Sequence, residues 1–399
     1  MNRNRFRTSF RHTLAVTTLS VLAAGSPLMS FQAYATPSFS HTAEEWATLQ
    51  DNKIEYGELA GLVHEYNTTV YNNRIKFADF KKDYGTTKDD VAQAYRDLAS
   101  ELYQDIDYPD TGDVTYGSSM AVAINARANA DSYEKQADEN LEDSTIINYG
   151  YEQAEANLVS VAQANMISYY QDQLTIQQAN LSKEQAQVSY DAAVSQQNVG
   201  TATQITVLNA KETLQSSDQT IQTAETSLAT VHQKLCVMLG WKYNDQPEIA
   251  ELPTLDLNRI TAMNPAVDVA KALENNYTLK INKRKLENAN SESQRDSLTK
   301  TIANNEANIG SSLTTAYQNV IASQTAYQLA QTDYQLAQQN MAIAEQNHSQ
   351  GTISQVEYRN QQITTQLKEI AVKSAELSLF QTMETYDWNV NGLASASAV

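Results

Sequence analysis

The feature that most constrains this chain is a seven-residue period of small side chains that occurs twice, 151 residues apart. Three alanines mark the period in each copy: Ala179, Ala186 and Ala193, and then Ala330, Ala337 and Ala344. Both copies run into a glycine turn, Val-Gly-Thr at 199–201 and Gln-Gly-Thr at 350–352. Because spacing, turn and register agree, the sequence predicts one structural unit present in two copies.

Beyond each turn the period continues with larger apolar residues. The first copy has Val207, Leu214, Ile221, Leu228 and Leu235, and the second has Val356, Ile363, Ile370 and Leu377 in a shifted phase. Such seams predict coiled-coil packing, and glycine lets the chain reverse between two helices. A helix over about 151–196 would be on the order of 70 Å long. The predicted fold class is therefore all-α, with two repeats of long antiparallel coiled-coil helical hairpins.

Composition supports this fold class and limits the function. Only 12 glycines and 6 prolines occur in 399 residues, too few turn residues for a β-sandwich or a doubly wound sheet. The net charge of −19 argues against nucleic-acid binding. Cys236 is the sole cysteine and is interpreted as a small core residue, so no intramolecular disulfide is expected. The five histidines lack metal-ligand spacing and no catalytic motif occurs, so we expect no metal, no cofactor and no enzyme activity.

The sequence divides into five segments. Residues 1–35 read as a signal peptide, because arginines precede an apolar stretch at 14–24 and an Ala-Tyr-Ala cleavage site at 33–35. The protein is therefore expected to be exported. The other predicted segments are a first repeat over 36–241 with its tip near 199–203, a linker over 242–265, a second repeat over 266–390 with its tip near 350–354, and a disordered tail over 391–399. A shorter helix is expected early in each repeat, at 59–77 and at 266–286.

These features resemble the TolC-like outer-membrane efflux protein family. The resemblance rests on Val-Gly-Thr-Ala-Thr at 199–203 with Val-Leu-Asn-Ala at 207–210, on Leu-Gly-Trp at 239–241, and on Gly-Thr-Ile-Ser at 351–354. The segment 273–277 is similar to a family motif, with Tyr277 in place of proline. The resemblance implies a homotrimeric helical tunnel in the cell envelope. It also implies hairpin tips that dock on a periplasmic adaptor (membrane fusion) protein, which joins an inner-membrane pump.

One departure from the family concerns its membrane-spanning strands. Family members insert two strands between the short and long helices of each repeat, and these strands build a shared barrel in the outer membrane. Here only 75 residues separate Asn276 from Gly351, whereas 133 separate Asn67 from Gly200. The stretch 279–310 is polar and is expected to be continuous helix, while 114–124 carries weak strand signals. The sequence thus predicts little or no β-barrel.

The hairpin tips are the predicted partner-binding site: Val199, Gly200, Thr201, Gly351 and Thr352. The alternative is that these residues serve only the helix–helix turn. The family often places an acidic residue at the position of Glu357, facing a narrow entrance. The resemblance therefore makes Glu357, with Asn360 in the next turn, the candidate entrance constriction; the alternative is a solvated surface glutamate. Ile353 stands where some relatives have a basic latch residue.

Two hypotheses follow for the function. The first is an outer duct component of a tripartite efflux or secretion system, which the duplicated hairpin and its tips favour. The second is an exported structural or interaction coiled-coil protein that forms no membrane pore, which the shortened second repeat favours. A secreted hydrolase is excluded because the sequence holds no catalytic constellation.

Overall fold

The computed structural model describes residues 42–397, so the predicted signal peptide lies outside the described residues. The chain divides after Trp46 into two compact units, and the second unit, Ala47–Val399, holds the long helices of both repeats. The described elements are α1 (Ala43–Leu49), β1 (Lys53–Ile54), η1 (Tyr56–Glu58), α2 (Leu59–Tyr66), α3 (Thr68–Tyr84), α4 (Lys88–Gln104), α5 (Tyr116–Glu139), α6 (Ser144–Asn198), α7 (Gln204–Met238), β2 (Glu248–Ile249), α8 (Asn258–Ala262), α9 (Pro265–Asn275), α10 (Tyr277–Asn288), α11 (Glu292–Ser349), α12 (Gln355–Trp388) and η2 (Asn389–Leu393). The predicted all-α fold class is confirmed.

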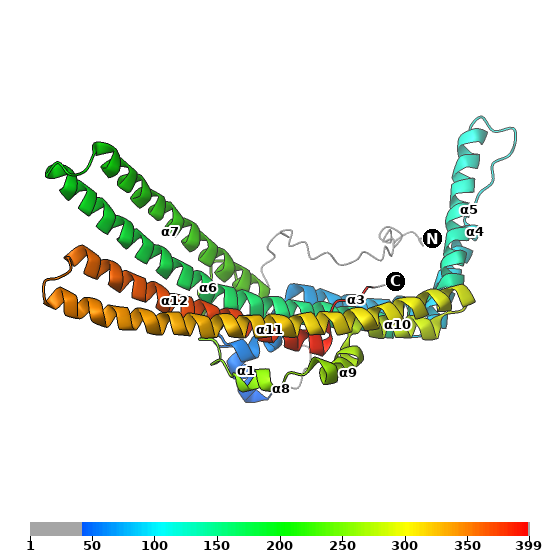
Figure 1. Cartoon of the computed structure of the whole chain (residues 1–399). Coiled ribbons are helices and arrows are strands. Elements are labelled where there is room, and N and C mark those ends of the chain that lie inside the picture. The colour runs from blue at the N-terminus through cyan, green and yellow to red at the C-terminus, as the bar shows by residue number, and fades with distance from the viewer. Residues whose placement is uncertain (1–41, 398–399) are drawn as a thin grey trace. The chain divides into compact units, whose positions relative to one another are not determined.

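Two long helical hairpins carry the duplicated period (Figure 1). In the first hairpin α6 meets α7 across the turn at 199–203, and in the second α11 meets α12 across the turn at 350–354. Five alanines of the period are buried, namely Ala179, Ala186, Ala193, Ala337 and Ala344. Small side chains at these positions let the paired helices approach closely.

The four long helices lie in the order α7, α6, α12, α11 along the half of the unit that ends in the two turns (Figure 1). Helix α6 packs against both α7 and α12, and α12 packs against α11. Polar contacts also join α6 to α12: the Trp388 indole donates to Gln163 Oε1 at 2.6 Å, and Arg359 pairs with Glu184. Helices α7 and α11 are therefore the two outer helices of this layer.

Asparagines break the shorter helices early in each repeat. Helix α2 gives way to α3 at Asn67, and α9 to α10 at Asn276, because each asparagine caps the helix that follows. The amide nitrogen of Asn67 also donates to the carbonyl of Met238 (2.8 Å), at the end of α7. That of Asn276 donates to the carbonyls of Gly392 and Ala394 (3.2 and 2.8 Å), after α12. The helical stretches expected at 59–77 and 266–286 are therefore present, and each is divided into two helices at its asparagine. The two asparagines bind the end of each repeat to its start.

The disordered tail predicted over 391–399 is wrong for its described residues, 391–397. Ala394 is buried, and the Asn305 side chain both donates to the Ser397 carbonyl and accepts from its N–H, each at 2.8 Å. Asn282 donates to the same carbonyl at 3.0 Å. Buried amide side chains thus satisfy the extended backbone of the C-terminal segment, as buried polar groups require.

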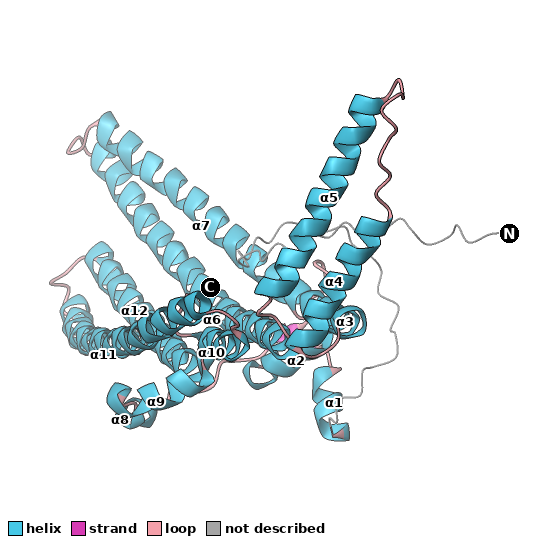
Figure 2. Ribbon diagram, turned by 90° about the vertical axis from the view of Figure 1, so that its right-hand side faces the viewer, coloured by secondary structure: helices cyan, strands magenta, loops and turns pink. Residues whose placement is uncertain are grey.

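A third hairpin, α4 with α5, follows the short helices of the first repeat (Figure 2). The weak strand signals at 114–124 do not correspond to a strand, because residues 116–124 belong to α5, which begins at Tyr116. Ala123, Ala130 and Ala137 recur every seven residues and are buried, so this helical spacing outweighs the β-branched residues around them. Among residues 42–397 the strands are β1 and β2, which pair in parallel over two residues each. No helix in this range combines the length and apolarity needed to cross a membrane.

The continuous helix expected over 279–310 is also wrong, because it is interrupted at 289–291. Ser291 begins α11 with a capping box, in which the Gln294 N–H donates to Ser291 Oγ (3.2 Å) and the Ser291 N–H donates to Gln294 Oε1 (3.1 Å). This Ser-x-x-Gln pattern satisfies two backbone donors and starts a new helix.

A buried polar junction beside this break joins the two repeats. Asp143 is fully buried and caps α6 through the Ile146 N–H (2.9 Å). Its second oxygen accepts from Arg284 Nε (2.7 Å) and Asn288 Nδ2 (3.1 Å). Because Asp143 precedes α6 while Arg284 and Asn288 belong to α10, the junction fixes the base of the first long hairpin against the second repeat.

Candidate functional site

The two hairpin turns, where the partner-binding residues were predicted, have the same backbone geometry. Gly200 and Gly351 have φ values of 79° and 71°, in the left-handed region that glycine adopts without strain. The next N–H, of Thr201 or Thr352, donates to the carbonyl five residues back, at 2.8 and 2.9 Å. This Schellman arrangement satisfies a terminal carbonyl of each long helix. The glycines are therefore required by the turn itself, whatever else the tips contact.

Both tips are exposed, and their surface is neutral. Val199 is 74% exposed, and Ile205 and Leu208, just after the first turn, are 69% and 55% exposed. The backbone of Gly200 and Gly351 is open, because a Cβ added at either glycine would meet nothing within 4 Å. No Asp, Glu, Lys or Arg occurs from 192 to 210 or from 346 to 356. An exposed apolar tip without charges is typical of a surface that packs against another protein.

Glu357 is exposed and caps its own helix. The N–H and hydroxyl of Ser354 donate to Glu357 Oε2 (2.8 and 2.9 Å), and the Glu357 N–H donates to Ser354 Oγ (3.2 Å). These hydrogen bonds lower the pKa of the Glu357 carboxyl, since they favour its ionised form. The local helix cap thus accounts for Glu357 within one chain, and its role in an entrance constriction stays a prediction.

Asn360 lies one turn further along α12, and its side-chain oxygen is buried without a hydrogen-bond donor. Arg359 beside it binds the first hairpin: its Nε donates to Glu184 Oε1 on α6 at 2.6 Å. The side chains of Arg359 and Glu184 are 35% and 37% exposed, so the pair contributes at most about 1 kcal/mol. Its main effect is to hold α12 against α6 near the tips.

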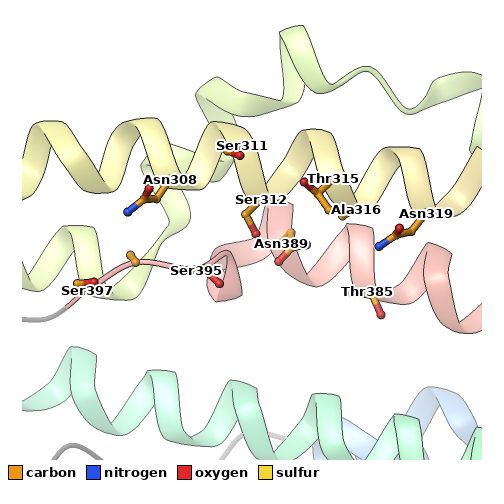
Figure 3. A pocket seen from close by; sticks show the side chains of 11 residues that line it. Asn308, Ser311, Ser312, Thr315, Ala316, Asn319, Thr385, Asn389, Ser395 and Ser397 are labelled. Atoms are coloured by element: carbon orange, nitrogen blue, oxygen red, sulfur yellow. The ribbon is translucent and has the colours of Figure 1, made fainter.

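A second candidate site is a polar groove beside the C-terminal segment, far along α11 from the tips (Figure 3). Its volume is about 480 Å³, and α11 lines it with Asn308, Ser311, Ser312, Thr315, Ala316 and Asn319. No lining residue is charged, so the groove offers hydrogen bonds but no charged ligand for a metal and no counter-charge for an anion. Within residues 42–397 no group of three His, Cys, Asp or Glu residues is placed to hold a metal ion.

We expect Glu357→Ala to fray the first turn of α12, because the Ser354 N–H and the Ser354 hydroxyl both lose the carboxylate oxygen that accepts from them. Amide hydrogen exchange should quicken at 355–358 and stay unchanged at 204–207, the matching turn after the first tip. Glu357→Gln is the control, since its amide oxygen still accepts the bond from Ser354. Unchanged exchange in Glu357→Ala would show that the capping box does not hold this turn.

Sequence reasoning missed two features near the tips. The Ser354-x-x-Glu357 pattern is itself a capping-box signature and could have been read from the sequence. The Arg359–Glu184 pair has no local signal, because 175 residues separate its members.

Comparison with known proteins shows the fold. No protein-family model matches the sequence, and no curated protein matches it either. Among solved structures, the outer-membrane channel OprN is similar, with 12% sequence identity, a TM-score of 0.55, and coverage of 92% of this chain and 99% of OprN. A membrane protein from Pseudomonas aeruginosa is similar at 11% identity and a TM-score of 0.54, with coverage of 91% of this chain and 97% of that one. The chain therefore has a TolC-like fold, as the sequence resemblance predicts.

Proposed function

We propose that this chain is the outer duct component of a tripartite efflux or secretion system. In this proposal the exported chain forms a homotrimeric helical tunnel in the cell envelope. Its hairpin tips dock on a periplasmic adaptor protein, which joins an inner-membrane pump that supplies the energy. The duct itself catalyses no reaction and needs no cofactor.

The observation that carries the proposal is a pair of matched, exposed turns at the same end of two long hairpins (Figure 2). The hairpins belong to a fold shared with an outer-membrane channel over 92% of the chain. Neutral polar residues dominate the exposed faces of these helices, for example Gln215, Gln222 and Gln339. Such faces suit a water-filled passage, because they provide hydrogen bonds without trapping charged cargo.

We expect the mature protein to sediment as a trimer at micromolar concentration, because a single chain supplies only four long helices. Analytical ultracentrifugation measures the mass, and negative-stain electron microscopy shows whether the particle is a hollow tube. A strict monomer would contradict the duct.

Proline at the tip glycines tests the docking. Proline fixes φ near −65°, which is incompatible with the values of 79° at Gly200 and 71° at Gly351. We expect Gly200→Pro and Gly351→Pro to weaken binding of the adaptor from the same cell by at least about tenfold, while far-UV circular dichroism changes little. Gly112→Pro, in the loop between α4 and α5, is the matched control and should bind normally. Equal losses of binding and of helicity would reduce the tips to an element of the fold.

A second candidate function is an exported interaction protein that keeps the tips but forms no membrane pore. It is favoured by helices α4 and α5, which occupy the place where the family resemblance implies strands. Conductance across planar lipid bilayers separates the two proposals. Steady channels from the purified trimer support the duct, whereas a trimer that binds the adaptor without conductance supports the interaction protein.

A further inference from the structure

The polar groove beside α11 has two walls that come from different parts of the second repeat. Helix α11 forms one wall over 308–319, and the end of α12 with the C-terminal segment at 395–397 forms the other. Figure 3 shows Asn308 and Ser312 on the side of α11 that faces this segment. Every lining side chain is Asn, Ser, Thr or Ala, so no long or aromatic side chain fills the space. The volume of about 480 Å³ lies within the usual range of ligand sites.

Most polar side chains of the groove are not used by the chain itself. No hydrogen bond within residues 42–397 involves the side chains of six of them: Asn308, Ser311, Ser312, Thr315, Asn319 and Asn389. Neighbouring asparagines behave differently, since Asn276, Asn282 and Asn305 all bind the backbone of the C-terminal segment. The groove therefore offers unpaired donors and acceptors on both of its walls, as recognition of a polar ligand requires.

The C-terminal segment is extended and only partly hydrogen-bonded. Ala394 has φ of −58° and ψ of 145°, and the Asn305 side chain binds both the N–H and the carbonyl of Ser397, as a neighbouring strand would. The backbone groups of Ser395 and Ala396 make no hydrogen bond with any residue in 42–397, and both residues line the groove. Extended backbone with unpaired N–H and C=O groups is a template on which another strand can pair.

Charge and shape restrict what the groove can hold. A charged ligand would lose hydration without gaining a counter-charge, because no lining residue is charged. The lining also contains no aromatic ring on which a base or a sugar could stack. The α11 wall from Asn308 to Asn319 is about 16 Å long, which is the length of about five residues of extended chain. These properties favour an uncharged extended peptide.

We propose that the groove binds an extended, uncharged peptide segment of a partner protein. The peptide pairs with the free backbone groups of Ser395 and Ala396, in the manner of a strand added to an open edge. Its other edge exchanges hydrogen bonds with the α11 wall, chiefly with Asn308 and Asn319. Because both walls carry short side chains, the site selects small residues such as glycine, alanine and serine. The inference is independent of the proposed duct, since all of these residues belong to one chain.

A synthetic peptide tests the site. The probe is Gly-Ser-Ala-Ser-Ala-Ser with both ends blocked and an uncharged dye attached, and fluorescence anisotropy with the mature protein measures its binding. We expect saturable binding, and at least about tenfold weaker binding when alternate peptide nitrogens are methylated, because such a peptide cannot donate the bonds of a strand pair. N-acetylchitotriose, the sugar probe, should not compete. Absence of saturable binding, equal binding of the methylated peptide, or competition by the sugar would each overturn the proposal.

Variants on the α11 wall locate the binding. The double variant Asn308→Ala with Asn319→Ala removes two exposed amides from the groove and should weaken peptide binding by at least about tenfold, without loss of helix content by far-UV circular dichroism. Gln318→Ala is the matched control, because it removes an exposed amide from the adjacent position on α11 but does not line the groove. If the double variant binds the peptide as tightly as Gln318→Ala does, the groove is not the binding site and the proposal is wrong.

Discussion

Asp143→Ala is expected to lower the free energy of unfolding by about 3 kcal/mol. It removes the cap of α6, worth about 1 kcal/mol, and the charge-assisted hydrogen bonds from Arg284 and Asn288, worth about 1.5–3 kcal/mol together with the donors left behind. Because Asp143 is fully buried, water does not replace these contacts. Urea unfolding followed by far-UV circular dichroism measures the change.

The matched control for Asp143 is Glu287→Ala. Glu287 also pairs with Arg284, at 2.6 Å, but its side chain is 64% exposed, so its loss should cost less than about 1 kcal/mol. Asp143→Asn should fall between the two, because its amide oxygen can still cap α6 without a charge for Arg284. Similar losses for Asp143→Ala and Glu287→Ala would mean that the junction acts only through surface charge.

Gly240→Ala is expected to be among the most damaging substitutions at a left-handed glycine. Gly240 ends the first repeat with φ of 92°, and an added Cβ would lie 2.5 Å from Cβ of Tyr66. The backbone conformation costs about 1–2 kcal/mol for alanine, and the overlap adds about 1–3 kcal/mol. The same unfolding experiment should show a total loss of about 2–5 kcal/mol. The clash separates α7 from the end of α2, where Asn67 binds the Met238 carbonyl.

Gly200→Ala isolates the conformational part of this effect. Gly200 has a similar φ of 79°, but a Cβ there would meet nothing within 4 Å, so the expected loss is only about 1–2 kcal/mol. A Gly240→Ala variant no less stable than Gly200→Ala would contradict close packing at the end of the first repeat. Gly392→Ala should lose about as much stability as Gly240→Ala, because Gly392 has φ of 116° and an added Cβ would lie 2.8 Å from the Asn275 carbonyl oxygen.

The expectations that succeeded rest on local periodicity. The alanine heptads ending at Ala193 and Ala344 predicted the buried seams of the long hairpins, because a period near 3.5 fixes which face of a helix is apolar. The breaks at Asn67, Asn276 and Ser291 were missed although capping residues mark each one. Helix-forming residues lie on both sides of each capping residue. Composition and heptad period alone therefore do not reveal that one helix ends there and another begins.

The sequence by itself determined the duplicated hairpin, since heptad spacing and a left-handed glycine are local properties of a few neighbouring residues. Only the tertiary structure decided the order α7, α6, α12, α11 and the burial of Asp143 between the repeats. The physical reason is separation along the chain. Asp143 and Arg284 are 141 residues apart, so no local pattern indicates that they pair. Likewise, an uncharged helix face has no sequence pattern that indicates which helix packs against it.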